Sequence, residues 1–275
     1  MSNPLIMKLE QFSPFTASER ERLNELLRYP TKTFKRGATI ISDRSKVDDI
    51  HLVLTGLAAR SKTLIDGTRQ TLAFLVPGDL CDLEVFVLEA MDHDIVALTD
   101  TTCVLIPAKE VEALLTESSS LTRALWWSTM TDSAVLRERI IDHGSRDARE
   151  QLAHIFCEML IRYRMVGETT DNSFSFPLTQ EDLAEATGLT PVHLNRILQQ
   201  MRTDGLVEFR RGVVKVLKVK RLMALAKFEA NYLHLNRTES RDPEVSYRVG
   251  DLVEPSHHSI LQGALDKIKG TFGSA

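Results

Sequence analysis

Residues 178–206 read LTQEDLAEATGLTPVHLNRILQQMRTDGL and predict two short helices joined by a tight turn. Thr179 can cap the first helix, because an aspartate follows three residues later, where a capping box places an acid. Gly188 supplies the turn with a backbone that reaches positive φ. Thr190 can cap the second helix, and Pro191 takes its first position, where a missing N–H costs nothing.

The second predicted helix, residues 191–204, has two distinct faces. Four apolar residues recur at helical spacing and should pack inward: Leu194, Ile197, Leu198 and Met201. The same spacing places four other residues on the opposite face: Val192, Asn195, Arg196 and Gln199. Amide and guanidinium groups make paired hydrogen bonds with base edges in the major groove of DNA. The alternative is a generic helical pair with a solvated polar face.

The sequence after this pair favours DNA binding. Two apolar runs, 206–209 and 213–217, flank Arg210-Arg211-Gly212 and predict a β-hairpin with glycine in its turn. A helix-turn-helix followed by such a hairpin is the winged form of the motif. Residues 191–228 contain nine Lys or Arg and two acids, a net +7, on a chain whose formal charge is −4. A local basic face on an acidic protein indicates contact with phosphates.

The rest of the chain predicts alternating classes of structure. Residues 1 to about 30 are expected to be helical, and residues 31–108 carry short β-rich runs between regularly spaced glycines, which favours a sandwich or roll. A long helix is expected over 121–141, ended by Asp142-His143-Gly144-Ser145. Another helix follows over 152–163, and residues 169–175 read as a polar loop.

Composition excludes several classes of protein. No apolar run approaches the roughly 18–20 residues that span a bilayer, and the start of the chain lacks a secretory pattern. The three cysteines are dispersed and form no CxxC pair, so we expect a cytoplasmic protein without a disulfide framework. We find no phosphate-binding glycine loop, HExxH or GxSxG motif, and therefore expect neither an enzyme nor a cofactor.

The order of these parts resembles the Crp/Fnr family of bacterial transcription regulators (cyclic-AMP receptor protein and fumarate/nitrate regulator). The stretches that carry the resemblance most specifically are LVPGDLCDLEVF, residues 75–86, and LTQEDLAEATGLTPVHLNRILQQMRTDGLVEF, residues 178–209. The resemblance implies an α+β fold with an N-terminal cyclic-nucleotide-binding-like β-roll (jelly-roll), a long dimerisation helix and a C-terminal winged helix-turn-helix. It implies these boundaries: a sensor domain over 1–116, the helix and hinge over 117–143, the DNA-binding domain over 144–236, and an extension of unknown role, partly disordered, over 237–275.

The family resemblance also implies partners. Members form homodimers, here along the helix 121–141, and each subunit places its recognition helix 191–204 in the major groove of double-stranded DNA. A two-fold dimer reads a palindromic operator with half-sites about one DNA turn apart. RNA polymerase is the further partner that the family implies.

Residue roles follow from position in the family's motif. Thr190 and His193 are expected to contact phosphate or groove edge, and Asn195 and Arg196 to be the main base readers, with Arg196 facing a guanine. Val192 departs from the family's usual acid and is suited to a thymine methyl group. The full expected DNA-binding set is Thr179, Thr190, Pro191, Val192, His193, Asn195, Arg196, Gln199, Arg210 and Arg211.

The expected effector pocket departs further from the family. Pro77-Gly78-Asp79 is kept, but Asp82-Leu83 stand where nucleotide binders have a glycine-acid pair, and His93-Asp94 stand where they have Arg-Ser. A carboxylate at 94 would repel a cyclic phosphate, and no guanidinium fork replaces the arginine. We therefore expect no response to cyclic AMP and leave the effector open. The amino-terminal cysteine cluster of the family's iron–sulfur sensors is also missing.

Other interpretations have less support. Asp92-His93-Asp94 with Cys81 and Asp82 could ligate a metal, but the spacing matches no closed site, so we expect none. Redox roles for Cys81 or Cys103, and a pH switch at His143, are weaker than ordinary packing or solvation. Trp126-Trp127 favour core or interface packing over an effector pocket. A different class of function would be a signalling or scaffold module whose β-roll binds a small molecule or a partner protein.

Overall fold

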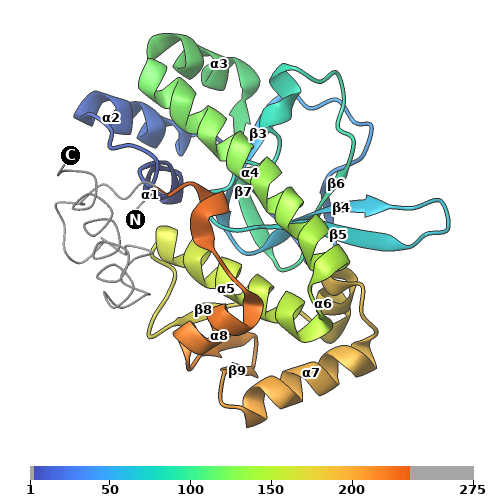
Figure 1. Cartoon of the computed structure of the whole chain (residues 1–275). Helices are drawn as coiled ribbons and strands as arrows, with labels where there is room; N and C mark the ends of the chain where they lie inside the picture. Colours follow the sequence, from blue (N-terminus) through green and yellow to red (C-terminus); the bar gives the residue numbers. More distant parts are fainter. Residues whose placement is uncertain (1–2, 236–275) are drawn as a thin grey trace, which may run out of the picture. The chain divides into compact units, whose positions relative to one another are not determined.

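A computed structural model describes residues 3–235 of the chain, so the expectations for 237–275 lie outside the described residues. In Figure 1 the chain runs from an N-terminal β-roll, blue to green, through the long helix α4 to the helices α6 and α7, in gold. The first elements are the helices α1, Pro4–Leu9, and α2, Ala17–Leu26, which confirm the predicted helical start.

Seven strands form the roll as two antiparallel sheets. The first has the order β1-β7-β3 and consists of β1 (Thr31–Phe34), β7 (Thr101–Pro107) and β3 (Asp49–Thr55). The second has the order β2-β6-β4-β5 and consists of β2 (Thr39–Ile41), β6 (Asp94–Ala97), β4 (Ala58–Thr63) and β5 (Arg69–Leu75). A 3₁₀ helix, η1 (Leu83–Phe86), lies between β5 and β6. The predicted roll is confirmed, and Asp66-Gly67 lies in the β4–β5 hairpin as expected.

Two helices follow the roll, α3 (Ala108–Glu117) and α4 (Ser119–Ser145). The predicted end of the long helix at residue 141 is wrong, because α4 continues to Ser145. Arg146 Nη1 bonds Asp142 2.8 Å away, and Arg146 Nη2 bonds Glu138 3.0 Å away. These charge-assisted contacts along one side of the helix end outweigh the roughly 1 kcal/mol that Gly144 costs in a helix.

Helix α4 turns two of its charged residues inward. Asp132 bonds Arg60 of the roll at 2.8 Å, and Arg139 is buried. The apolar residues that α4 exposes lie elsewhere on the helix: Trp126, Met130, Leu136, Ile140 and Ile141. Trp126 is 66% exposed and Ile140 is 72% exposed, so this face lacks an apolar partner within the described subunit.

The C-terminal half is a three-stranded sheet with five helical segments. The helical segments are α5 (Ala148–Met165), α6 (Gln180–Thr187), α7 (Pro191–Thr203), α8 (Val219–Ala226) and the 3₁₀ helix η2 (Ala230–Leu233). The sheet has the order β8-β10-β9, with β8 (Ser173–Ser175), β10 (Val213–Val216) and β9 (Val207–Arg210). The predicted polar loop over 169–175 is thus wrong at its end, because Phe174 is buried and pairs with Val214 of β10.

One hydrophobic core joins the roll to the C-terminal half. It contains roll residues such as Phe74 and residues of α5–α8, and the Phe74 and Phe176 rings meet edge to face, with centroids 5.4 Å apart. Polar contacts hold α6 against β5: Arg69 Nε lies 3.0 Å from the Glu185 carboxylate, and Gln70 donates to the Glu185 carbonyl at 2.8 Å. Helix α6, the first helix of the predicted helix-turn-helix, is therefore packed directly on the roll.

Buried charges run beside this core. Asp79 of the Pro77-Gly78-Asp79 turn lies 2.8 Å from Lys8 of α1 and 2.6 Å from Arg162 of α5. Burial would raise the pKa of Asp79, but the charges of Lys8 and Arg162 outweigh it and lower the pKa to about 2. Arg162 also donates to the Phe74 carbonyl at 2.9 Å and to Glu158 at 3.2 Å. The Pro77-Gly78-Asp79 turn thus binds two cations of the protein itself, Lys8 and Arg162.

Candidate nucleic-acid interface

The turn between α6 and α7 forms as the sequence predicts. Thr179 caps α6 by accepting from the Asp182 backbone N–H at 3.1 Å, and the Asp182 carboxylate accepts in return from the Thr179 N–H at 2.7 Å. Gly188 ends the helix in the left-handed region, at φ 65°. Thr190 then caps α7 by accepting from the His193 N–H at 3.3 Å. Caps and a left-handed glycine therefore define both ends of the turn, as the local sequence predicts.

Helix α7 is amphipathic as predicted. Its inward residues are fully buried: Leu194, Ile197, Leu198 and Met201. On the opposite side Val192 is 82% exposed. Arg196 and Gln199 are also exposed, and Asn195 is half-buried.

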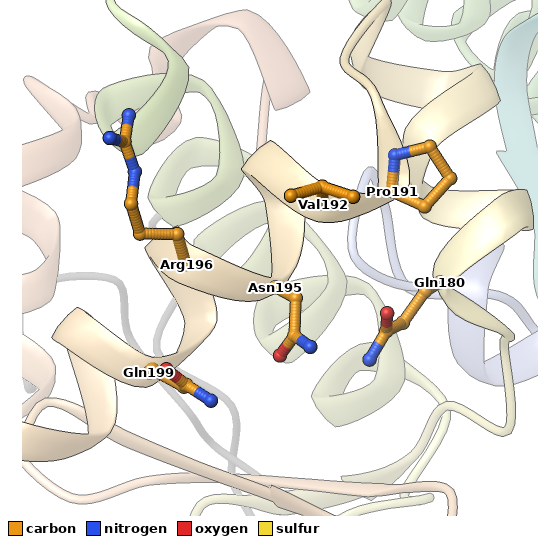
Figure 2. A pocket seen from close by; sticks show the side chains of 6 residues that line it. All are labelled: Gln180, Pro191, Val192, Asn195, Arg196 and Gln199. Carbon is orange, nitrogen blue, oxygen red and sulfur yellow. The ribbon is translucent and has the colours of Figure 1, made fainter.

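The outward face of α7 borders a shallow hollow of about 280 Å³. Six side chains line it: Gln180, Pro191, Val192, Asn195, Arg196 and Gln199. Figure 2 shows the amides of Gln180 and Asn195 extending to the same side, while the guanidinium of Arg196 extends to the opposite side. The hollow therefore combines apolar surface at its helix start with amide donors and acceptors and one cation, a set that matches base edges in a major groove.

The predicted wing is a two-residue hairpin. Val213 pairs with Arg210, and the connecting residues Arg211 and Gly212 have φ values of 51° and 74°, as a type I′ turn requires. A Cβ on Gly212 would lie 2.7 Å from the Pro177 Cβ, so the turn also needs glycine for space. Arg210 and Arg211 are exposed at this hairpin.

The cations counted in the sequence are all exposed. The set comprises Arg196, Arg202, Arg210, Arg211, Lys215, Lys218, Lys220, Arg221 and Lys227. Some already have partners: Arg202 donates to the Phe209 carbonyl at 2.8 Å, and Lys227 lies 2.6 Å from Glu150. Arg196 of α7 and Arg210 and Arg211 of the wing place positive charge at the surface, as contact with a phosphate backbone requires.

The structure brings five of the predicted residues together at the hollow: Pro191, Val192, Asn195, Arg196 and Gln199. Thr179 and Thr190 serve as helix caps, His193 is half-buried on α7, and Arg210 and Arg211 belong to the wing. Sequence reasoning missed Gln180. Its signal was its place directly after the cap, at the first position of α6, where a side chain can extend toward the second helix.

The predicted effector residues are engaged within the roll. Asp82 is fully buried and accepts from the His51 N–H at 2.9 Å, with its other oxygen 2.8 Å from His51 Nδ1. Burial raises the pKa of Asp82, although the His51 contacts oppose the rise. Asp94 accepts from the Asp43 N–H at 2.9 Å, His93 lies 2.6 Å from Asp92, and Leu83 begins η1.

The other candidates have ordinary environments. The three cysteines are free and buried, and burial raises the pKa of Cys157. Trp127 is buried and stacks on Phe12, whereas His143 is exposed and contacts Gln151 at 3.2 Å. Within residues 3–235, no three His, Cys, Asp or Glu side chains gather as metal ligands would. No helix of that range has the length and apolar character needed to cross a membrane.

Comparisons with known proteins match both halves. Residues 31–118 match the family model of a cyclic nucleotide-binding domain, and residues 150–225 match that of a Crp-like helix-turn-helix domain. The transcriptional activator protein FnrL of Cereibacter sphaeroides is 26% identical over 188 residues, which cover 66% of this chain and 75% of FnrL. The transcriptional activatory protein AadR of Rhodopseudomonas palustris is 25% identical, over 78% of this chain and 87% of AadR.

A solved structure shares the fold. The structure of FixK2 from Bradyrhizobium japonicum superposes with a TM-score of 0.64 at 24% identity, over 71% of this chain and 96% of that chain. The likeness extends through both halves, so the order of roll, long helix and winged unit is common to the two proteins.

Proposed function

Because the chain belongs to the Crp/Fnr family of transcription regulators, with a cyclic nucleotide-binding domain before a helix-turn-helix, we propose that it acts as a homodimer on palindromic operators. Regulators of this family bind DNA and act as dimers. We propose the domain boundaries that the sequence predicts: the sensor domain over 1–116, the dimerisation helix and hinge over 117–143, and the DNA-binding domain over 144–236. We further propose that the protein works in the cytoplasm, has no enzymatic activity and acts together with RNA polymerase.

The exposed apolar face of α4 supports the proposed dimer. Trp126, Met130 and Ile140 recur at helical spacing on a helix of 27 residues, with their side chains in solvent. Contiguous apolar surface of this kind marks a protein interface. A second copy related by a two-fold axis would cover the same residues of both subunits, since such an interface is self-complementary. The proposed interface is thus centred on Trp126, Met130 and Ile140.

The observation that carries DNA recognition is the exposed face of α7 at the hollow. Arg196 is suited to the O6 and N7 atoms of guanine, and Asn195 to the N6 and N7 atoms of adenine. Val192 presents methyl groups where a thymine methyl can meet them. Arg210 and Arg211 of the wing contact phosphates, which adds affinity without sequence choice.

The sensor roll is proposed not to bind cyclic AMP or cyclic GMP in the usual manner. The carboxylates of Asp82 and Asp94 stand where nucleotide binders need a phosphate or ribose site, and both already accept hydrogen bonds from the roll. Arg60, which is buried inside the roll, is neutralised by Asp132 of α4. Titration calorimetry with either nucleotide should give no heat of tight binding, and a dissociation constant in the micromolar range or below would overturn this proposal.

The test of DNA binding is fluorescence anisotropy on operator fragments over a range of salt concentrations. The wild type should form a specific complex whose affinity falls steeply with salt. Arg196→Ala should cost about 1–3 kcal/mol and relax base choice, while Arg211→Ala should weaken all sequences alike and reduce the salt slope by about 1. Gln200→Ala, an exposed change on α7 outside the hollow, is the control. A wild-type protein that forms no salt-sensitive specific complex with any fragment would refute the function.

A further inference from the structure

Gln180 brings an amide of the first reading helix to the hollow on the second. It is exposed at the first position of α6, and with Asn195 of α7 it lines the same space. The two amides extend to one side, away from the Arg196 guanidinium (Figure 2). Among residues 3–235, no protein group hydrogen-bonds to either amide, so both are available to a ligand. Two helices thus supply one pair of adjacent, unoccupied amides.

An amide discriminates between bases only when its orientation is fixed. An asparagine side chain carries a donor and an acceptor on one flat group, and a half turn exchanges them. Adenine offers one acceptor, N7, and one donor, N6, whereas guanine offers two acceptors, N7 and O6. Asn195 therefore selects adenine if its oxygen is held toward N6, and it tolerates other bases if the amide rotates freely.

The position of Gln180 is suited to holding that oxygen. In helix-turn-helix proteins the first helix crosses the DNA backbone while the second enters the groove, and the backbone N–H groups at a helix start favour phosphates. In the proposed complex, Gln180 therefore lies where the DNA backbone passes, beside Asn195. Its amide has two N–H donors. One can bond a phosphate oxygen, and the other can bond Asn195 Oδ1.

On the basis of the proposed DNA binding, we infer that Gln180 is a positioning residue that orients the Asn195 amide for adenine. Asn195 Oδ1 accepts from Gln180 and from adenine N6, while Nδ2 donates to N7. Val192, on the same face of α7, meets the methyl group of a thymine. Each half-site then contains an A·T pair beside the guanine of Arg196, and Gln180 sets the preference at the A·T pair without touching a base.

The experiment is selection of bound sequences from a randomised DNA library, with full-length protein and one stated salt concentration throughout. Wild type, Gln180→Ala and the control Gln200→Ala are selected in parallel, and their melting temperatures confirm that all are folded. Gln180→Ala should lower the preference for adenine at one position of each half-site by about fivefold or more, the lower end of what a bidentate contact contributes. The preference for guanine should remain, because Arg196 lies on the other side of the hollow.

A second variant separates orientation from simple loss of a phosphate contact. Gln180→Arg keeps the donors and should keep the adenine preference, whereas Gln180→Glu offers only acceptors and should lose it. The inference is overturned if Gln180→Ala weakens all sequences equally, or if its selected motif equals that of the wild type. A wild type that enriches no motif refutes the proposed function instead, so the two failures are distinguishable.

Discussion

Replacing Arg162 by methionine tests whether the buried charges between the roll and α5 stabilise the protein. Arg162 donates to Asp79 at 2.6 Å, to Glu158 at 3.2 Å and to the Phe74 carbonyl at 2.9 Å, and its side chain is 9% exposed. The change leaves Asp79 with Lys8 as its partner and Glu158 with Arg139. Removing one partner of a buried pair costs about 3–5 kcal/mol, because the other charge stays buried.

The assay is chemical and thermal unfolding at pH 7. A loss of 3–5 kcal/mol corresponds to a fall in melting temperature of about 6–20 °C for a chain of roughly this size. Arg20→Met is the matched control, since Arg20 bonds Glu10 at a similar 2.7 Å but its side chain is 53% exposed. An exposed pair contributes about 0–1 kcal/mol, so the control should lie close to the wild type.

Acid provides an independent check. The folded pKa of Asp79 is about 2 and the unfolded value is about 3.9, so its ionised form stabilises the fold above pH 4. This stabilisation, about 3 kcal/mol, is lost as the pH falls from about 4 to about 2. Without Arg162 the pKa of Asp79 should rise, because only the Lys8 charge then opposes burial. The difference between wild type and Arg162→Met should therefore shrink below pH 4.

Two results would refute this reasoning. One is a cost below about 1 kcal/mol at pH 7, which would mean that water replaces the arginine without penalty. The other is a difference that stays constant from pH 7 to pH 3, which would mean that the loss of the Arg162 charge does not act through Asp79.

Three further changes test the wing, the helix face and the base preference. Gly212→Ala should destabilise the protein by more than Gly67→Ala, because both glycines have positive φ but only a Cβ at 212 meets Pro177; equal melting temperatures would contradict the clash. Trp126→Asp should yield monomers in sedimentation experiments, whereas Ile65→Asp, at a still more exposed apolar position on the β4–β5 hairpin, should leave dimers intact. Val192→Glu should shift one position of the selected motif from thymine to cytosine, by about 1–3 kcal/mol of discrimination, and an unchanged motif would exclude Val192 as a reader.

The reading unit was predictable because its signals are local. Each signal acts on residues that are only a few positions away in the sequence. The signals are the caps at Thr179 and Thr190, the glycine at 188 and the apolar spacing in α7. One error arose at a helix end, and the other arose where contacts between residues distant in the sequence decide. Residues 142–145 stay helical because Arg146 bonds back along the helix, and β8 exists because Phe174 has a buried place beside β10.

The faces of α4 could not be assigned from periodicity for a similar reason. A charged residue on a helix usually points to solvent. Asp132 and Arg139 instead point inward, because each forms an ion pair there, Asp132 with Arg60 and Arg139 with Glu158. Those partners come from β4 and α5, far away in sequence. Gln180 was missed for a different reason. Its proposed role depends on its being near Asn195 of another helix, and the sequence alone does not show that these two residues line the same hollow.

The core shared by the roll and the C-terminal half has a consequence for exchanging parts between relatives. Phe74 of β5 packs against Phe176, and Glu185 of α6 is bound by Arg69 and Gln70 of the same strand. A chimera that takes its roll from one regulator and its reading unit from another would bring together surfaces that were never fitted to each other. Transplanting the DNA preference of this protein should therefore succeed through the outward residues of α7 together with Gln180 of α6. Swaps of the whole unit should require the facing residues of β5 to be moved with it.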